Sequence, residues 1–411
     1  MDKSLSGAVA LPGSKSESNR VLMIAAYGGL PPSIANLSDA HDTVLLQHCL
    51  QQIAASASQD LTVVDCEDAG TVARFLLTYL ASHEGKWLLT GSPRMLERPM
   101  KPLVDTLLQL GADIRYQGRQ GYLPVLVMGH PLRGGEAHID GSQSSQFVSS
   151  ILLAAPCWTA GLRLRMETTA YSQPYIGMTV GLMRHFGVPV TVEGDTITVP
   201  SHPYMPKMTR VSPDWSSASY WYEFAALADE CDLLLKDLCD DSLQGDRAVA
   251  EMYTSLGVTS RFEPEGVRLS KHTQTKTGNV PLSFNLSDTP DLFPALVVTC
   301  VALHRPVTFQ GIRNLAFKES NRVESMLSEL SKLYTFINII GDDKLVIEKS
   351  SCMLIDYTIN DLLIHTYQDH RVAMAFAPLR CRFPFLHIDH PETVKKSYPK
   401  FWNEIQRLME P

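Results

Sequence analysis

The stretch LVDTLLQLGADIRYQGRQGYLPVLV, residues 103–127, contains one complete supersecondary unit. Its opening residues place leucines with the spacing of an amphipathic helix, and a glycine then interrupts that spacing. Two short runs rich in β-branched and aromatic residues follow, with a glycine-containing turn between them. The stretch therefore predicts a helix, a short strand, a tight turn and a second strand.

The same pattern returns three times, in residues 181–199, 250–270 and, less cleanly, 326–348. Consecutive copies begin about 70 to 80 residues apart, and self-similarity at a fixed period indicates a repeated structural unit. Between the copies lie two apolar stretches that open with serines, SSQFVSSILLAAP at 144–156 and SSASYWYEFAALA at 216–228. We expect these to be buried helices with serine N-caps. The chain is therefore predicted to be an array of α/β units.

Composition limits the class of protein. With 411 residues, of which 45% are apolar and 19% charged, the chain is long for a single core, so two domains are expected. The proline-rich residues 199–215 are the predicted linker between the two halves. No run is apolar enough for a membrane span, and the N-terminus lacks the apolar core of a signal peptide. We therefore expect a cytoplasmic protein that does not bind membranes.

The charge and the cysteines argue against two further classes of protein. The net charge of −8 argues against nucleic-acid binding, so any site for an anion must be a local concentration of lysine and arginine. The eight cysteines never form a C-x-x-C pair, which argues against zinc ribbons and thioredoxin-type chemistry.

Clusters of cations and small polar residues stand at five predicted helix starts. They are GSKSESNR at 13–20, EDAGTVAR at 67–74, GSQSSQF at 141–147, FKESNR at 317–322 and QDHR at 368–371. Each one alone is more typical of a helix cap or a solvated turn than of a ligand site. Together, in an acidic protein, they indicate a pocket for multiply charged anions, because arginine holds phosphate and carboxylate oxygens in pairs.

Ten motifs, taken in order, resemble those of the 5-enolpyruvylshikimate-3-phosphate synthase family (3-phosphoshikimate 1-carboxyvinyltransferase), a family of enolpyruvyl transferases. They span about residues 11–400 and are LPGSKSESNR, DAGTVAR, PRMLERP, GSQSSQF, SQPYI, DWSSASY, DTPD, KESNR, YQDHR and KKSYP. Ordered agreement of ten motifs is specific, whereas any single one is weak.

The resemblance implies an α/β fold of two similar domains. Each would consist of three repeated α/β units in an inside-out α/β barrel, with the active site in the cleft between the domains. The first domain would be discontinuous, with residues 1–13 and 214–411, and the second would contain residues 14–213.

The family reaction transfers the enolpyruvyl group of phosphoenolpyruvate to the 5-hydroxyl of shikimate 3-phosphate, by addition and elimination, in aromatic amino acid biosynthesis. It needs no metal or organic cofactor, and we expect a monomer. The resemblance assigns shikimate 3-phosphate to Lys15, Ser16, Arg20, Ser144, Ser145, Ser172, Tyr175, Asp291, Asn314 and Lys318. It assigns phosphoenolpyruvate to Lys15, Gly70, Arg98, Gln146, Arg322, Arg371 and Lys396.

The resemblance gives catalytic roles to Lys15, Asp291, Glu319 and Lys396. Asp291 would act at the substrate hydroxyl, and Glu319 would lie near the methylene carbon that gains a proton. From the residues alone, Asp291 could equally be a helix N-cap, Glu319 a solvated charge and Lys396 a surface lysine.

Two positions depart from the family pattern, since Asp68 and Asn321 stand where asparagine and aspartate are usual. Asp68 adds a negative charge beside the phosphoenolpyruvate residues, which affects binding strength more than the type of reaction.

Two other functions stay open at this point. The sister family that transfers enolpyruvate to UDP-N-acetylglucosamine shares the fold but typically has a reactive cysteine, sometimes an aspartate, in an arginine-rich loop, and the region around GSPRMLERP has no cysteine. The second alternative is a non-catalytic anion-binding relative, and the presence of Lys15, Asp291 and Glu319 together argues against it.

Overall fold

The computed structural model describes residues 4–29, 34–56, 60–168, 171–271, 280–333, 335–350, 362–381, 383 and 385–409. The chain divides into two compact units, of which unit 1 is Met1–Gly13 with Ser212–Pro411 and unit 2 is Ser14–Val211. The chain thus leaves unit 1 after Gly13 and returns to it at Ser212. Residues 212 and 213, which the sequence analysis assigned to the second domain, lie in unit 1.

Unit 2 contains two four-stranded sheets with the same topology. One has the order β3-β4-β6-β5, with β3 at Thr62–Asp65, β4 at Gly85–Thr90, β5 at Asp113–Tyr116 and β6 at Val125–Gly129. The other has the order β7-β8-β10-β9, with β7 at Gly135–Ile139, β8 at Leu162–Met166, β9 at Thr191–Glu193 and β10 at Thr196–Val199. In each sheet the first two strands are parallel, and a hairpin adds two antiparallel strands.

Unit 1 repeats this topology twice. In one sheet the order is β1 (Ser4–Ala10), β12 (Glu230–Lys236), β14 (Gly266–Lys271) and β13 (Thr259–Glu263). In the other it is β15 (Leu282–Asn285), β16 (Val307–Gln310), β18 (Lys344–Ser350) and β17 (Thr335–Ile340). β1 and β12 pair in parallel, with Val9 opposite Leu235, although all of unit 2 separates them in the chain. This sheet therefore joins the two segments of unit 1.

The repeated sequence pattern corresponds to a helix and the hairpin that follows it. Residues 103–127 contain most of α5 (Lys101–Gln109) with β5 and β6. The glycine that ends the helix has a φ of 91° at Gly111 and 90° at Gly187 and Gly257, a left-handed conformation that glycine adopts at little cost. The predicted array of α/β units is confirmed.

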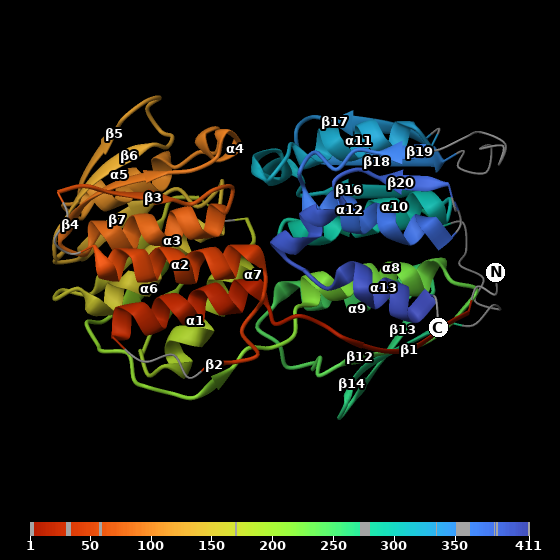
Figure 1. Ribbon diagram of the computed structural model, residues 1–411, viewed down its shortest axis with the longest axis horizontal. Coiled ribbons are helices and arrows are strands. Elements are labelled where there is room, and N and C mark those ends of the chain that lie inside the picture. Colours follow the sequence, from red (N-terminus) through yellow and green to blue (C-terminus); the bar gives the residue numbers. More distant parts are fainter. Residues whose placement is uncertain are drawn as a thin grey trace. The chain divides into compact units, whose positions relative to one another are not determined.

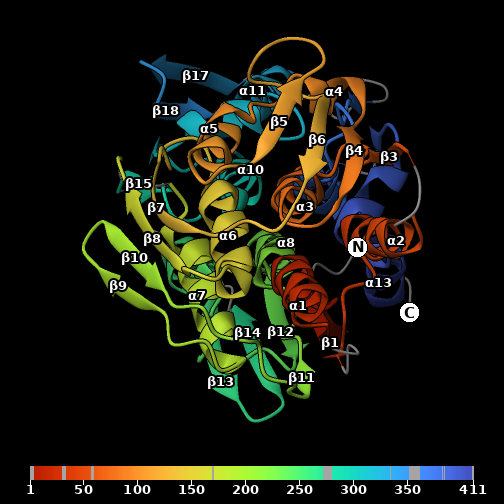
Figure 2. The ribbon, with the colours of Figure 1, turned by 90° about the vertical axis from the view of Figure 1, so that its left-hand side faces the viewer.

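Helices form the interior of each unit. In unit 2 they are α1 (Lys15–Gly28), α2 (His41–Ala55), α3 (Gly70–Ala81), α6 (Ser145–Ala154) and α7 (Gln173–His185), and Figure 1 shows α1, α2 and α3 side by side. In unit 1 they include α8 (Trp215–Leu227), α10 (Phe293–Ala302), α11 (Arg322–Ser331) and α12 (His370–Phe376). Every residue of α8 and α10 is buried. β3 and β8 alternate buried and exposed residues, so one face of their sheets is solvated and the other is buried. In unit 2, β4 and β6 lie beside α3 (Figure 2).

The two buried helices with serine-rich starts are capped differently. Ser144 is the N-cap of α6, and its hydroxyl accepts a hydrogen bond from the N–H of Gln146, as predicted. α8 is capped by Asp214, whose carboxylate accepts bonds from the N–H and the hydroxyl of Ser217. The prediction of a serine cap for α8 is therefore wrong, because the aspartate just before the helix is the stronger acceptor.

Each unit also has a two-stranded parallel sheet, β2 (Ile34–Ala35) with β11 (Thr209–Arg210) in unit 2 and β19 (Leu362–Ile364) with β20 (Leu386–Ile388) in unit 1. The remaining α-helices are α4 (Pro93–Leu96), α9 (Val249–Met252) and α13 (Phe401–Met409). Across the described ranges, no helix is long and apolar enough to cross a membrane.

Candidate active site

Most predicted site residues of unit 2 lie at or near the N-terminal ends of its helices, whereas Arg98 lies in the connection between α4 and α5. Lys15 opens α1, and its ammonium group is 3.0 Å from the carboxylate of Asp42 in the first turn of α2. Gly70 opens α3, and Ser145 opens α6. Unpaired N–H groups and the helix dipole favour negative charge at such ends, so this part of unit 2 is suited to bind anions.

Arg20 joins three of these helices. Its guanidinium donates from Nε to Oγ1 of Thr179 at 2.7 Å and from Nη1 to the carbonyl of Ser16 at 2.9 Å. Nη2 donates to Oγ of Ser149 and to the carbonyl of Tyr175, both at 3.2 Å. The side chain is buried, and burial lowers the pKa of Arg20 to about 10. Most of its N–H groups are thus used within the protein, and Arg20 holds Ser16 and Tyr175 in place.

Gly70 lies against two guanidinium groups. A Cβ atom at this position would lie 2.6 Å from Nη1 of Arg74 and 2.7 Å from Cζ of Arg98. Nη1 of Arg74 donates to Oε1 of Gln146 at 2.6 Å, and Nη1 of Arg98 donates to the carbonyl of Asp68 at 3.2 Å. The start of α3 and the two arginines form a surface that suits phosphate or carboxylate oxygens. The structure therefore brings Gly70, Arg98 and Gln146 together.

Ser172 and Tyr175 lie at the start of α7. Ser172 is its N-cap, is buried and has a φ of 60°, which a residue other than glycine adopts at a cost. The ring of Tyr175 lies 5.8 Å from the guanidinium carbon of Arg20. Both residues are thus held next to the framework that Arg20 builds.

The predicted site residues of unit 1 form a network around Asp291. One carboxylate oxygen accepts hydrogen bonds from Nζ of Lys318 at 3.2 Å and Nη1 of Arg322 at 3.0 Å. The other accepts a bond from Nη2 of Arg371 at 3.0 Å. Burial alone would raise the pKa of Asp291, but the three cations lower that pKa well below its usual range. Asp291 is therefore ionised.

Asp291 does not cap a helix. It lies in the short 3-10 turn Pro290–Leu292, and α10 begins after it with Leu292 as the N-cap. The helix-cap interpretation is wrong, because the cations bind the carboxylate that a cap would need.

Arg322 is the centre of a further set of ion pairs. Its fully buried side chain donates from Nε to Asp369 at 2.9 Å and from Nη2 to Glu319 at 2.8 Å. Asp369 is also the N-cap of α12, where it accepts a bond from the N–H of Arg371 at 2.9 Å. One carboxylate thus positions both predicted phosphoenolpyruvate arginines of unit 1. The interpretation of Glu319 as a solvated charge is wrong, since its side chain is only 12% exposed.

Asn314 and Lys396 are also buried in unit 1. The side-chain oxygen of Asn314 has no hydrogen-bond partner among the described residues. Because an unpaired buried acceptor costs about 1–3 kcal/mol, a substrate hydroxyl that donates to it would bind favourably. Lys396 is buried whereas Lys395 and Lys400 are exposed, so the surface-lysine interpretation is wrong.

Sequence reasoning missed three carboxylates. Asp42 pairs with Lys15, and Asp369 positions the two arginines described above. Asp246 is buried and bonded to the hydroxyl of Ser216, and its burial together with the nearby Asp291 raises its pKa to about 7. Asp369 stands inside the QDHR motif, which is a usable signal. Asp42 and Asp246 stand in no cation-rich cluster, so no pattern distinguishes them.

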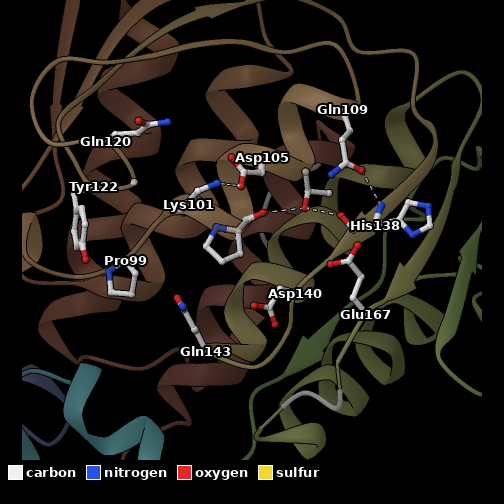
Figure 3. Close-up of a pocket in the computed structure, with 13 residues that line it drawn as sticks. Pro99, Lys101, Asp105, Gln109, Gln120, Tyr122, His138, Asp140, Gln143 and Glu167 are labelled. Atoms are coloured by element: carbon white, nitrogen blue, oxygen red, sulfur yellow. Dashed lines mark hydrogen bonds and ion pairs between the residues drawn. The ribbon is translucent and has the colours of Figure 1, made fainter.

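A separate cavity of about 410 Å³ lies within unit 2 (Figure 3). Its 13 lining residues include none of the predicted site residues. On its wall Lys101 pairs with Asp105, and Gln109 accepts a hydrogen bond from the N–H of His138 at 3.0 Å. These groups are bonded to one another, and we give the cavity no part in the chemistry.

The chain matches known proteins over almost its whole length. The family model of EPSP synthase (3-phosphoshikimate 1-carboxyvinyltransferase) matches residues 1–62 and 54–405. The 3-phosphoshikimate 1-carboxyvinyltransferase of Bacteroides fragilis is 37% identical over 405 residues, which cover 97% of this chain and 94% of that protein. The enzyme of the same name from Methanosphaerula palustris is 34% identical over 418 residues, covering 97% of this chain and 96% of the relative.

Solved structures share the fold. EPSP synthase from Acinetobacter baumannii superposes with a TM-score of 0.72 at 20% identity, covering 98% of this chain and 96% of the other. The enolpyruvyl transferase NikO from Streptomyces tendae gives a TM-score of 0.69 at 17% identity, covering 98% and 95%. At these identities the likeness concerns the fold alone, and it confirms the α/β fold class that the sequence predicts.

Proposed function

This chain belongs to the EPSP synthase family, and we propose that the two sets of residues described above carry out the family reaction. The protein is an enzyme, a 3-phosphoshikimate 1-carboxyvinyltransferase. It transfers the enolpyruvyl group of phosphoenolpyruvate to the 5-hydroxyl of shikimate 3-phosphate and releases phosphate, in the shikimate pathway of aromatic amino acid biosynthesis.

The reaction sets three chemical requirements. The 5-hydroxyl gives its proton to a base and its oxygen bonds to C2 of phosphoenolpyruvate while C3 gains a proton from an acid. The adduct then loses phosphate from C2 and one proton from the methyl group at C3. A base must act at the hydroxyl, an acid must act at C3, and cations must hold two phosphates and a carboxylate.

Phosphoenolpyruvate is proposed to bind to the guanidinium groups at the helix starts. Supporting observations are the contact of Gly70 with Arg98 in unit 2 and the fixed orientation of Arg322 and Arg371 in unit 1. Paired N–H donors of this kind match phosphate and carboxylate oxygens. The proposed residues are Lys15, Gly70, Arg98, Gln146, Arg322, Arg371 and Lys396.

Shikimate 3-phosphate is proposed to bind to side-chain hydroxyls, the Asn314 amide and charged side chains. Cations and hydroxyls suit its phosphate, and hydrogen-bond acceptors suit its ring hydroxyls. The buried oxygen of Asn314, which has no hydrogen-bond partner within the described ranges, supports this role, because a ring hydroxyl can donate to it. The proposed residues are Lys15, Ser16, Arg20, Ser144, Ser145, Ser172, Tyr175, Asp291, Asn314 and Lys318.

Asp291 is the proposed base and Glu319 the proposed acid–base group at C3, with Lys15 and Lys396 supplying charge. While Arg322 and Arg371 bond to Asp291, the low pKa of this carboxyl makes it a weak base. An anion that attracts the two arginines weakens their effect on the carboxylate, so its pKa rises. Binding of phosphoenolpyruvate would thus activate the base.

The observation that carries the proposal is the position of Asp291 between residues assigned to different substrates. Its carboxylate bonds to Lys318, a proposed shikimate 3-phosphate residue, and to Arg322 and Arg371, which are proposed for phosphoenolpyruvate. A base for this reaction has to act where the two substrates meet.

Phosphate release tests the proposal directly. Purified enzyme with phosphoenolpyruvate should release phosphate when shikimate 3-phosphate is added and should be inactive with either substrate alone. Release with UDP-N-acetylglucosamine instead would support the sister activity, and no release with either acceptor would support a non-catalytic relative.

We also propose the domain assignment, the oligomeric state and the cellular compartment of the enzyme. Units 1 and 2 would correspond to the two family domains, and each has its own hydrophobic core. The enzyme would act as a monomer in the cytoplasm. Light scattering after size exclusion would test the monomer, and a dimer mass at working concentration would contradict it.

A further inference from the structure

The turn that precedes α12 has an uncommon backbone. Tyr367 and Gln368 are its central residues, with φ angles of 53° and 56°. The N–H of Asp369 donates to the carbonyl of Thr366 at 2.8 Å and closes the turn. Two consecutive positive φ angles occur in type I′ turns, where glycine, asparagine and aspartate are favoured over side chains such as tyrosine and glutamine. The turn is therefore strained and needs support from its surroundings.

Glu329 on α11 supplies such support. Its side chain is fully buried, and Oε1 accepts a hydrogen bond from the hydroxyl of Tyr367 at 2.7 Å. Oε2 accepts a bond from the N–H of His365 at 2.9 Å and from Nζ of Lys332 at 2.5 Å. Lys332 also donates to the carbonyl of Leu363 at 2.9 Å. One buried carboxylate therefore fixes the backbone just before the turn and a side chain within it.

The residues after the turn belong to the candidate site. Asp369 is the last residue of the turn. Its carboxylate accepts a hydrogen bond from Nε of Arg322, and the residue is the N-cap of α12. Arg371, two positions further on, reaches Asp291. A change in the two central φ angles would rotate this segment and move Asp369 and Arg371 away from their partners.

We propose that Glu329 is a positioning residue for the enolpyruvyl transfer, holding the turn at 366–369 so that Arg371 and Asp369 meet Asp291 and Arg322. Across the described part of the chain, its carboxylate accepts hydrogen bonds from His365, Tyr367 and Lys332. We therefore expect Glu329 to affect the arginines only through the conformation of the turn. The inference rests on the proposed role of the two arginines in binding phosphoenolpyruvate.

The test separates positioning from a general effect on folding. Glu329→Gln should raise KM for phosphoenolpyruvate about tenfold and leave KM for shikimate 3-phosphate within about twofold, because buried side-chain networks couple strongly to their neighbours. Tyr367→Phe removes one hydrogen bond and should give a smaller change of the same kind. Glu324→Gln, on the exposed side of the first turn of α11, is the matched control and should change neither constant.

A rescue experiment sharpens the test. Glycine adopts a positive φ without support, so adding Gln368→Gly to Glu329→Gln should restore most of the lost affinity for phosphoenolpyruvate. Equal shifts in both KM values, or no rescue by glycine, would overturn the proposal. If Glu329→Gln did not fold, the KM ratio of Tyr367→Phe, with and without Gln368→Gly, would decide it. A wild-type enzyme that released no phosphate would instead overturn the proposed function.

Discussion

The two units use one scaffold for two kinds of charged site. Both gather most of their proposed site residues at or near helix starts, with Arg98 and Lys396 as exceptions. In unit 2 Arg20 bonds to neutral oxygens, among them the hydroxyl of Ser149. In unit 1 Arg322 bonds to the carboxylates of Asp291 and Asp369.

Neutral and carboxylate partners leave an arginine suited to different tasks. A neutral partner orients a guanidinium without cancelling its charge, which leaves that charge for an anionic ligand. A carboxylate partner cancels the charge but is itself kept ionised, which makes it available for proton transfer. If the proposed roles hold, the partner residues would decide whether a helix start mainly binds or also reacts; the Lys15–Asp42 pair shows that unit 2 has carboxylate partners as well.

Removing the central carboxylate of unit 1 should have the largest effect. Asp291→Asn takes away the proposed base and the group that Lys318, Arg322 and Arg371 share, so kcat should fall by about 10²–10⁴-fold. Asp232→Asn, at an exposed aspartate of β12, should leave kcat within about twofold. A kcat for Asp291→Asn close to that of the parent, measured by phosphate release, would contradict the role of Asp291.

Removing a cation from unit 2 should cost somewhat less. Lys15→Ala should lower kcat/KM by about 10²–10³-fold, or about 2.7–4 kcal/mol, because a preorganised charge is lost. It also leaves the buried Asp42 without its ammonium partner, so the melting temperature should fall as well. The control is Lys101→Ala, which breaks an exposed pair with Asp105 and should have almost no effect. Loss of both activity and secondary structure by circular dichroism would instead indicate a structural role for Lys15.

A small change of shape in unit 2 should have a moderate effect. The methyl group of Gly70→Ala displaces the guanidinium ends of Arg74 and Arg98, so KM for phosphoenolpyruvate should rise about tenfold, equivalent to about 1.4 kcal/mol. Those ends are flexible, so the melting temperature should stay unchanged. Gly177→Ala in α7 is the matched control, since among the described residues no atom beyond its chain neighbours and its own helix backbone would lie within 4 Å of the added Cβ atom. Equal KM values in the two variants would rule out this steric account.

The smallest effect on turnover concerns a carboxyl of unit 1 that pairs with no cation among the described residues. Glu223 on α8 is fully buried, neither of its oxygens has a hydrogen-bond partner within the described residues, and burial raises its pKa well above the usual value. Folding therefore favours the protonated form, and stability falls as pH rises above the usual glutamic acid pKa, by up to about 1.4 kcal/mol per pH unit.

Glu223→Gln should remove that dependence. In urea unfolding the variant should gain stability relative to the parent between pH 5 and pH 8, with little change in kcat, since Glu223 is not a proposed site residue. Glu265→Gln, at an exposed position, should follow the parent at each pH. A constant difference between Glu223→Gln and the parent across this range would show that Glu223 is not neutral in the folded protein.

Much of the fold could be predicted from local patterns. The helix, glycine and hairpin of residues 103–127 recur because each has a local cause, namely the spacing of apolar residues and the left-handed φ at Gly111 and its equivalents. The predicted serine cap of α8 is wrong because two residue types able to cap stand two positions apart, and local rules do not choose between Asp214 and Ser216.

The site was less accessible to local reasoning. The motifs indicate the cations but not the carboxylates near them. Asp42, which pairs with Lys15, and Asp246, which accepts a bond from Ser216, both lie outside the cation-rich motifs. The strain at Tyr367 and its support by Glu329 have no sequence pattern either, since φ angles and contacts between α11 and the turn are properties of the folded chain.

The sequence by itself determined the repeated α/β units, the anion-binding chemistry and the family, because these depend on residue type and on spacing along the chain. The tertiary structure decided which charges meet. Asp291 could have been a helix cap or a base, and its pKa is low only because Lys318, Arg322 and Arg371 arrive from two later segments of unit 1. Electrostatic energy depends on distance through space and on burial, and neither of these is written in the order of the residues.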